Sequence, residues 1–432
     1  MTAVLEATPA AAWPEPTAVG KQALVPPVPG QVNLDYAASA PCARVAADAV
    51  AEILPWYASV HRGAGALSQR CTLAYEQARQ AIGDFAGARA DDYVIFTRNT
   101  TDALNLLAHA VPAGTAVVTF GGEHHANLLP WKDSVRLPVP GSPGEAVRSL
   151  DAALRELRRL APEDPILVSV AAAGNVTGEV WPVEKLALAA HRHGARVAVD
   201  AAQLAPHRPI DLTTLGADYL ALSGHKLYAP FGAGVLVGKA DWLDAAGPYL
   251  AGGGATARVG DATHDVRWTT GPARHEAGTP NLLGAVALAA VCAYFESEGF
   301  PVQSEQALVT RLREGLAALP GVAELRIFAR DADRVGIVSF AVEGRPAADV
   351  SAGLARFGVG VRDGLFCAHP LARRLLGEAA TRHGWTSVPE SAVRASVGLG
   401  STVDDVDAFL TALASVLATA PNEAAPGACS GV

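Results

Sequence analysis

Short apolar segments alternate with helical segments through most of this 432-residue chain. Each apolar segment is too short for a buried helix and suits a buried strand. Strands that alternate with helices form a mostly parallel sheet covered by helices on both faces, so we expect an α/β fold. The expected strands are 93–96, 116–120, 166–170, 196–199, 219–222 and 234–237. The expected helices include 43–54, 72–85, 149–160, 183–193 and 282–296.

The length is sufficient for two domains, each with its own core. We expect a large domain over residues 31–299 and a smaller α+β domain over 300–418, where the rhythm of helices and strands changes. Residues 1–30 and 419–432 are rich in alanine and proline and lack periodicity, so flexible tails are predicted at both ends.

Composition narrows the class of protein. Half of the residues are hydrophobic, 18% are charged and the net charge is -9, which disfavours binding to nucleic acid or to an anionic membrane. Five scattered cysteines without a CxxC pair predict neither a zinc site nor disulfides. The longest apolar stretch, 282–295, is too short to span a bilayer, and the N-terminus lacks a signal-peptide pattern. We therefore expect a cytoplasmic protein with reduced thiols.

Two polar residues stand where expected strands end. Asp200 follows the strand 196–199, and Lys226 follows the strand 219–222 after Ser223, Gly224 and His225. Ligands of parallel sheets bind at the carboxyl ends of the strands. A lysine that bonds to an aldehyde and an acid that pairs with a pyridinium nitrogen suit pyridoxal phosphate (PLP), although either residue alone is more often a surface or capping residue.

A phosphate site is predicted beside this pair. Thr100 and Thr101 follow the strand 93–96 and begin a helical run, where free backbone N–H groups and hydroxyls attract anions. Ser223 and His225, which flank the lysine, are expected to complete the site. An ordinary helix N-cap is the alternative interpretation.

The sequence also offers partners for the cofactor ring. His124 follows the strand 116–120 and is expected to stack on the ring and to serve in proton transfer. Gln203 lies three residues after Asp200, and we expect it to hydrogen-bond the ring hydroxyl. The adjacent histidines could instead suggest a metal, but no carboxylate or cysteine has matching spacing, so no metal site is predicted.

Candidate substrate-binding residues occur in the C-terminal third. Arg394 stands among apolar and small residues and can bind an amino-acid carboxylate through two hydrogen bonds. Arg362 is a second basic candidate, and Asn175 is expected to contact both cofactor and substrate. Cys367 lies in an expected loop between Gly364 and Pro370, where it is either a nucleophile or an inert thiol.

Taken together, these residues resemble those of fold-type I PLP enzymes of aminotransferase class V, and most closely the Suf-type cysteine desulfurases and selenocysteine lyases. The resemblance covers about residues 33–415. It is carried by the stretches 33–38, 61–63, 99–105, 123–131, 175–178, 199–203, 223–228, 252–254, 276–280, 362–370 and 394–396.

The resemblance implies a PLP enzyme that is a homodimer with shared active sites and that delivers sulfur to an acceptor, which could be a protein. Lys226 would hold PLP covalently, and Thr279 would reach the phosphate in the neighbouring subunit. Cys367 would take sulfur from the substrate as a persulfide, while Arg394 and Asn175 bind its carboxylate. The other implied cofactor ligands are Thr100, Thr101, His124, Asp200, Gln203, Ser223 and His225.

Several positions depart from the family pattern. Leu365 and Phe366 replace two histidines before the cysteine, Gly65 replaces a third, and Gly400-Ser401 replaces a Tyr-Asn pair. The substrate rim is thus expected to be more apolar and more open than in the family. The leading hypothesis is a cysteine desulfurase or selenocysteine lyase that yields alanine. The alternatives are a C–S β-lyase, an epimerase or an aminotransferase, and a PLP-fold protein that binds a partner without turnover.

Overall fold

The computed structural model describes residues 21–262 and 264–419. Most of the predicted tails, together with Cys429, lie outside the described residues. Within the segment predicted as the N-terminal tail, however, Ala23 and Leu24 are buried, and Leu24 forms a bridge with Ala43. Apolar burial therefore orders this end of the predicted tail, since both side chains join the large hydrophobic core.

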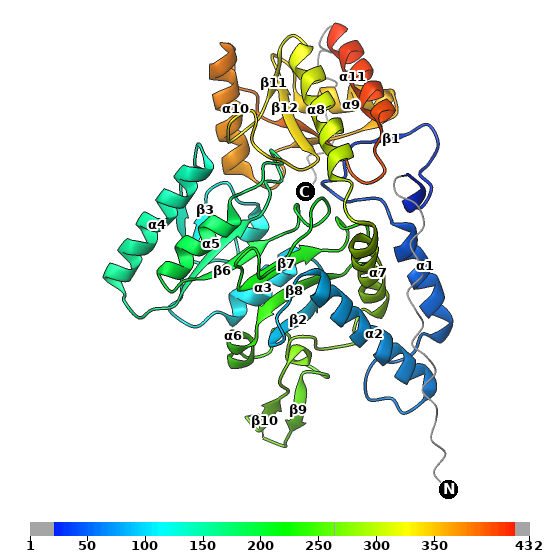
Figure 1. Ribbon diagram of the computed structural model, residues 1–432, viewed down its shortest axis with the longest axis vertical. Coiled ribbons are helices and arrows are strands. Elements are labelled where there is room, and N and C mark those ends of the chain that lie inside the picture. Colours follow the sequence, from blue (N-terminus) through cyan, green and yellow to red (C-terminus); the bar gives the residue numbers. More distant parts are fainter. Residues whose placement is uncertain (1–20, 263, 420–432) are drawn as a thin grey trace.

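A seven-stranded sheet forms the centre of the molecule (Figure 1). Five neighbouring strands are parallel, and β8 alone runs against its neighbours β7 and β2. The expected mostly parallel sheet is confirmed. In spatial order its strands are β2 (Asp92–Thr97), β8 (Gly234–Lys239), β7 (Tyr219–Ser223), β6 (Arg196–Asp200), β5 (Ile166–Ala171), β3 (Ala116–Phe120) and β4 (Val135–Leu137).

Helices cover both faces of this sheet because alternate strand residues are apolar on each face. In β5, Val168 faces one cluster of buried side chains while Leu167 faces the other. The first cluster contains side chains of α1 (Arg44–Ile53), α2 (Ala66–Phe85), α4 (Pro143–Leu160), α5 (Val183–Arg192) and α7 (Leu282–Glu298). The second contains α3 (Thr100–Ala110) and α6 (Ala240–Ala245).

A four-stranded antiparallel sheet follows in the C-terminal part, at the top of Figure 1. Phe340 of its central strand faces a cluster with three helices, while Ala341 faces the cluster that contains α10. The strands in order are β11 (Val322–Glu324), β12 (Ile337–Val342), β15 (Ala392–Ser396) and β14 (Arg362–Gly364). The helices are α8 (Val302–Ala318), α9 (Ala347–Arg356), α10 (His369–His383) and α11 (Val403–Ala418).

An N-terminal segment joins this C-terminal sheet region, which the sequence did not predict. Strand β1 (Val32–Asn33) pairs in parallel with β13 (Val359–Gly360), and Leu34 is fully buried among the side chains of the C-terminal core. Asp35 forms a bridge with Ser396. Two segments more than 300 residues apart thus meet at the C-terminal core.

Short elements complete the fold. A hairpin of β9 (Thr256–Val259) and β10 (Val266–Trp268) projects from the end opposite the C-terminal sheet (Figure 1). The single-turn helices are η1 (Lys21–Ala23), η2 (Leu54–Trp56), η3 (His125–Asn127) and η4 (Pro272–Arg274). Among the described residues no single helix is long and apolar enough to cross a membrane. Helices α7 and α8, which are bent by 96° at the break between them, together meet the length and composition of a membrane span.

Candidate active site

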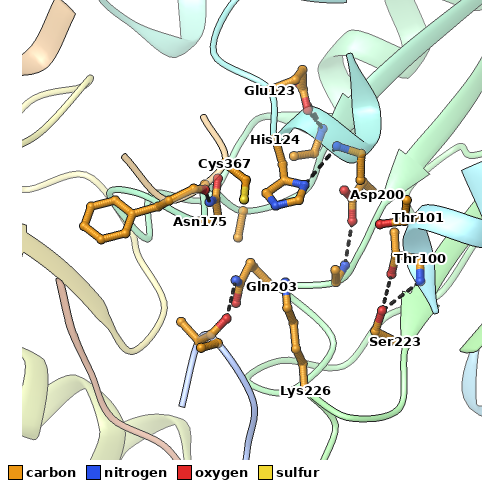
Figure 2. A pocket seen from close by; sticks show the side chains of 18 of the residues that line it. Thr100, Thr101, Glu123, His124, Asn175, Asp200, Gln203, Ser223, Lys226 and Cys367 are labelled. Carbon is orange, nitrogen blue, oxygen red and sulfur yellow. Dashed lines mark hydrogen bonds between the residues drawn. The ribbon is translucent and has the colours of Figure 1, made fainter. Parts of the chain in front are cut away.

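One cavity of about 350 Å³ lies between the carboxyl ends of the parallel strands and the C-terminal sheet, and it is lined by residues of both. The predicted site residues, although far apart in sequence, meet there (Figure 2). Thr279 is the exception, because it is exposed and does not line this cavity in its own chain. The predicted residues that line the cavity are Thr100, Thr101, His124, Asn175, Asp200, Gln203, Ser223, His225, Lys226, Arg362, Cys367 and Arg394.

One end of the cavity is the start of helix α3. The backbone N–H of Thr100 donates to Ser223 Oγ at 2.8 Å, and the two hydroxyls of these residues lie 2.8 Å apart. Asn99 caps the helix by accepting from Asp102 N at 3.0 Å. Gly234 permits this arrangement, since an added Cβ would lie 2.6 Å from the Cα of Asn99. Hydroxyls and a helix N-terminus are the groups that bind a phosphate.

Two buried polar residues face the middle of the cavity from the end of β6. Asp200 accepts a hydrogen bond from Ala202 N at 2.9 Å, and burial raises the pKa of its carboxyl while the charge of Lys226 opposes that shift. Gln203 donates through Nε2 to Ala37 O at 3.0 Å, but its Oε1 is buried without a hydrogen-bond partner. A buried acceptor without a partner costs free energy, so this atom is suited to a ligand donor.

His124 and Lys226 line the same space (Figure 2). His124 Nδ1 accepts from Ala126 N at 3.0 Å, so the neutral ring carries its proton on Nε2. Burial, assisted by the charge of Lys226, lowers the pKa of His124 to about 3. Burial also lowers the pKa of Lys226 to about 8, although nearby Asp200 opposes the shift. A lysine with a lowered pKa supplies the neutral amine that bonds to an aldehyde.

These groups fit PLP. The hydroxyls and helix start match its phosphate, and Asp200 matches a pyridinium nitrogen. The unpartnered Oε1 of Gln203 can accept a hydrogen bond from the ring hydroxyl, while the neutral imidazole of His124 can lie against the ring without placing a second positive charge beside Lys226.

The opposite wall belongs to the C-terminal sheet. Arg394 on β15 is 3% exposed, and burial lowers its pKa to about 10. Its Nη1 donates to Asn175 O at 3.0 Å and its Nη2 lies 3.5 Å from Asp35 Oδ1, while Nε has no partner. Arg362 is exposed and forms a closer pair with Asp35, at 3.0 Å. Arg394 thus retains a free N–H group that an amino-acid carboxylate could accept.

Cys367 lies in the turn between β14 and α10, and its side chain is exposed to the cavity. Phe366 and Cys367 both adopt left-handed backbone angles, with φ of 52° and 51°. Each such residue costs about 1–2 kcal/mol, so the surroundings must hold this turn. Asn175 Nδ2 donates to Phe366 O at 2.6 Å, and His125 N donates to Cys367 O at 2.7 Å. The amide of Asn175, predicted to bind ligands, is therefore also engaged with the backbone of this turn.

Two carboxylates of the site were missed at the level of sequence. Glu123 lines the cavity, accepts from Asn127 Nδ2 and Ala171 N at 2.9 Å each, and has a pKa raised to about 8 by burial. Asp35 joins the two arginines. Both residues stand in stretches that carry the family resemblance, but a sequence does not show which carboxylates are buried or shared.

The fold and the site together define the class of enzyme. The model of the family "Aminotransferase class-V" matches residues 32–409, so the chain belongs to this family. Its fold is that of PLP-dependent enzymes of fold type I, as predicted, and the chain is a PLP-dependent enzyme.

Individual relatives carry a more specific name. The chain is 35% identical to a cysteine desulfurase of Klebsiella pneumoniae over 393 residues, which cover 88% of this chain and 92% of the relative. It is 36% identical to a probable cysteine desulfurase of Synechocystis, with 83% and 84% covered. The apo structure of a cysteine desulfurase from Thermococcus onnurineus superposes with a TM-score of 0.77 at 32% identity, over 89% of this chain and 94% of that one.

Proposed function

We propose that the protein is a cysteine desulfurase, which converts L-cysteine to L-alanine and leaves the sulfur as a persulfide on Cys367. The observation that carries this proposal is the position of an exposed thiol in the same cavity as Lys226 and the buried Arg394. Relatives that bear this name are similar along almost their whole length.

The residues of the cavity would bind PLP on one side and the substrate carboxylate on the other. Thr100, Thr101, Ser223 and His225 would hold the phosphate of PLP, and Lys226 would bond to its aldehyde. Bound PLP supplies an electron sink for bonds broken at the substrate α-carbon. The free Nε–H of Arg394 would bind the substrate carboxylate and so orient the β-carbon and its sulfur.

Two groups of the cavity whose pKa values are lowered by burial have different roles in the reaction. The amine of Lys226, with a pKa of about 8, would take and return the proton at the α-carbon. His124, neutral with its proton on Nε2, would remain a hydrogen-bond donor at physiological pH.

Sulfur transfer then requires only Cys367. Its thiolate would attack the substrate sulfur, so that an S–S bond forms, the C–S bond breaks and the released electron pair stays with the substrate. Protonation of the β-carbon completes alanine. The net reaction is L-cysteine plus the Cys367 thiol giving L-alanine plus the Cys367 persulfide, and a sulfur acceptor then regenerates the thiol.

The apolar rim supports a second candidate, a C–S β-lyase acting on a cysteine conjugate. Ile327, Phe366 and Leu371 line the cavity, and a larger apolar substituent on sulfur could contact them. An epimerase or aminotransferase, and selenocysteine lysis, would use the same cofactor site. A partner-binding protein without turnover would have no use for the paired Asp200 and Lys226.

We further propose that the active enzyme is a homodimer. Thr279 is exposed and absent from its own cavity, which is consistent with a contact to the PLP phosphate of a second subunit. Sedimentation of the PLP-bound enzyme tests this, because a fully active monomer would exclude the shared site.

Product analysis separates the candidate reactions. The PLP-bound enzyme is incubated with L-cysteine and a thiol reductant, and alanine, pyruvate and sulfide are quantified. We expect alanine and sulfide in equal amounts. Pyruvate in place of alanine would identify a β-lyase, D-cysteine would identify an epimerase, and 3-mercaptopyruvate would identify an aminotransferase. Parallel incubations with S-alkyl cysteines and selenocysteine define the substrate range.

A further inference from the structure

The turn that carries Cys367 is held against its own backbone preference. Phe366 and Cys367 have consecutive left-handed backbone angles, and neither is glycine. Both carbonyls of this pair accept short hydrogen bonds from the seven-stranded sheet region, one from the Asn175 side chain and one from His125 N. The His125 ring also packs edge-on against His369, with 4.5 Å between the ring centroids. The conformation of the turn therefore depends on groups outside it.

Phe366 connects this turn to the arginine that faces the substrate. The residue is 8% exposed, and the guanidinium carbon of Arg394 lies 5.0 Å from the ring centroid. This distance is within the range of a cation–π contact, which is strengthened by burial. The same ring packs with Val176 and Leu371 in the apolar cluster beneath α10.

Asn175 closes the connection on the other side. Its backbone O accepts from Arg394 Nη1 at 3.0 Å, while its side chain donates to Phe366 O at 2.6 Å. Arg394, Asn175 and Phe366 thus form a closed circuit of contacts, and Cys367 is the next residue along the chain. Of the three guanidinium nitrogens of Arg394, only Nε has no hydrogen-bond partner among the described residues.

We propose that Phe366 is a positioning residue that couples the binding of a carboxylate at Arg394 to the reactivity of Cys367, an inference that rests on the proposed function. A carboxylate that accepts from Nε draws the guanidinium toward the cavity and partly neutralises its charge, which changes its contact with the Phe366 ring. Because the ring, its carbonyl and Cys367 belong to one strained turn, the thiol responds to the bound substrate. Phenylalanine has no proton to transfer, so Phe366 acts only through packing and its cation–π contact with Arg394.

The test measures the alkylation rate of Cys367 in the PLP-bound enzyme by mass spectrometry, with and without saturating L-alanine. Ethylamine, which is L-alanine without its carboxylate, is the control ligand, and the absorbance of bound PLP reports saturation by either. We expect L-alanine to change the rate by about two- to fivefold, the worth of a cation–π contact, and ethylamine to leave it unchanged.

Variants separate coupling from simple shielding of the thiol by bound L-alanine. In Phe366→Leu we expect the L-alanine effect to disappear although L-alanine still saturates, whereas Phe366→Tyr, which keeps the ring, retains it. Phe357→Leu is the matched control at an exposed position. Thermal unfolding and PLP content confirm folding, and Phe366→Met replaces Phe366→Leu if the latter unfolds.

Two results would overturn the proposal. Shielding acts alike in both proteins, so an equal L-alanine effect in Phe366→Leu refutes coupling, as does a wild-type rate that saturating L-alanine leaves unchanged. If L-alanine does not bind at all, both the proposed function and the coupling fail. Since alkylation requires no turnover, a lack of desulfuration alongside an intact L-alanine effect refutes only the proposed function.

Discussion

The two walls of the active site are built in different ways. The cofactor wall consists of residues at regular strand ends and at a helix start, and Asp200, Gln203 and Ser223 on it are buried. The opposite wall, here called the rim, includes the strained Phe366–Cys367 turn, whose carbonyls are held by hydrogen bonds from Asn175 and His125. The PLP-binding groups therefore depend on secondary structure, whereas the position of the Cys367 thiol depends on tertiary contacts.

This difference determines how each wall should respond to a substitution. Strand-end groups are oriented by the backbone hydrogen bonds of the sheet, so one substitution removes a group without moving its neighbours. The Phe366–Cys367 turn is held through a few side-chain contacts, so substitutions there also change geometry. Variants of the cofactor wall should lose specific chemistry, while rim variants should also change substrate preference.

The largest effect is expected for Lys226→Ala. Loss of this amine removes both the covalent attachment of PLP and the proton carrier, so turnover should fall by about 10³-fold or more. The visible absorbance of bound PLP should shift, and borohydride reduction of the wild type should label Lys226. Lys132→Ala, at an exposed position, is the control. A pyridoxyl label on another lysine would refute the assignment.

On the rim, Cys367→Ala should reduce desulfuration of cysteine by about 10²–10³-fold while PLP binding stays normal, because only the thiolate that takes the sulfur is lost. Selenium leaves more readily than sulfur, so some selenocysteine lysis should remain. Cys42→Ala serves as the control, since this half-buried thiol lies away from the cavity. Wild-type desulfuration by Cys367→Ala would exclude the persulfide route and favour the lyase.

Asp200→Asn should lower turnover by about 10²-fold, since a neutral amide cannot hold a proton on the ring nitrogen. PLP content, measured after alkaline release, should remain close to that of the wild type because the phosphate and lysine contacts are unchanged. If turnover is nearly normal, another residue supports the ring nitrogen.

The smallest effect concerns pH. Burial lowers the pKa of Lys226 to about 8, so the neutral amine that bonds to PLP already predominates above that pH. The rate at which PLP-free protein takes up PLP should therefore rise about tenfold per pH unit below 8 and level off above it. A rate that continues to rise to pH 10 would indicate an ordinary, solvated lysine.

Much of the fold was predictable from apolar periodicity. The strand 116–120 has the predicted bounds, and the other predicted strands of the central sheet agree within two residues at either end. Helix α2 begins at Ala66 and not at 72, and α4 begins at Pro143 and not at 149. Ser142 caps α4 by accepting from Glu145 N, a signal that outweighs the polar first turns of this helix.

For the site, the sequence alone determined the residue types at the strand ends and hence the cofactor, since a helix start, an acid and a lysine in that order along the chain allow few other ligands. Only the tertiary structure decided that β1 pairs with β13 beside the C-terminal core, that Asp35 links Arg362 and Arg394, and that Asn175 holds the turn of Cys367. Local patterns report which backbone a segment prefers. Contacts between segments hundreds of residues apart depend instead on burial and packing, which only the folded chain contains.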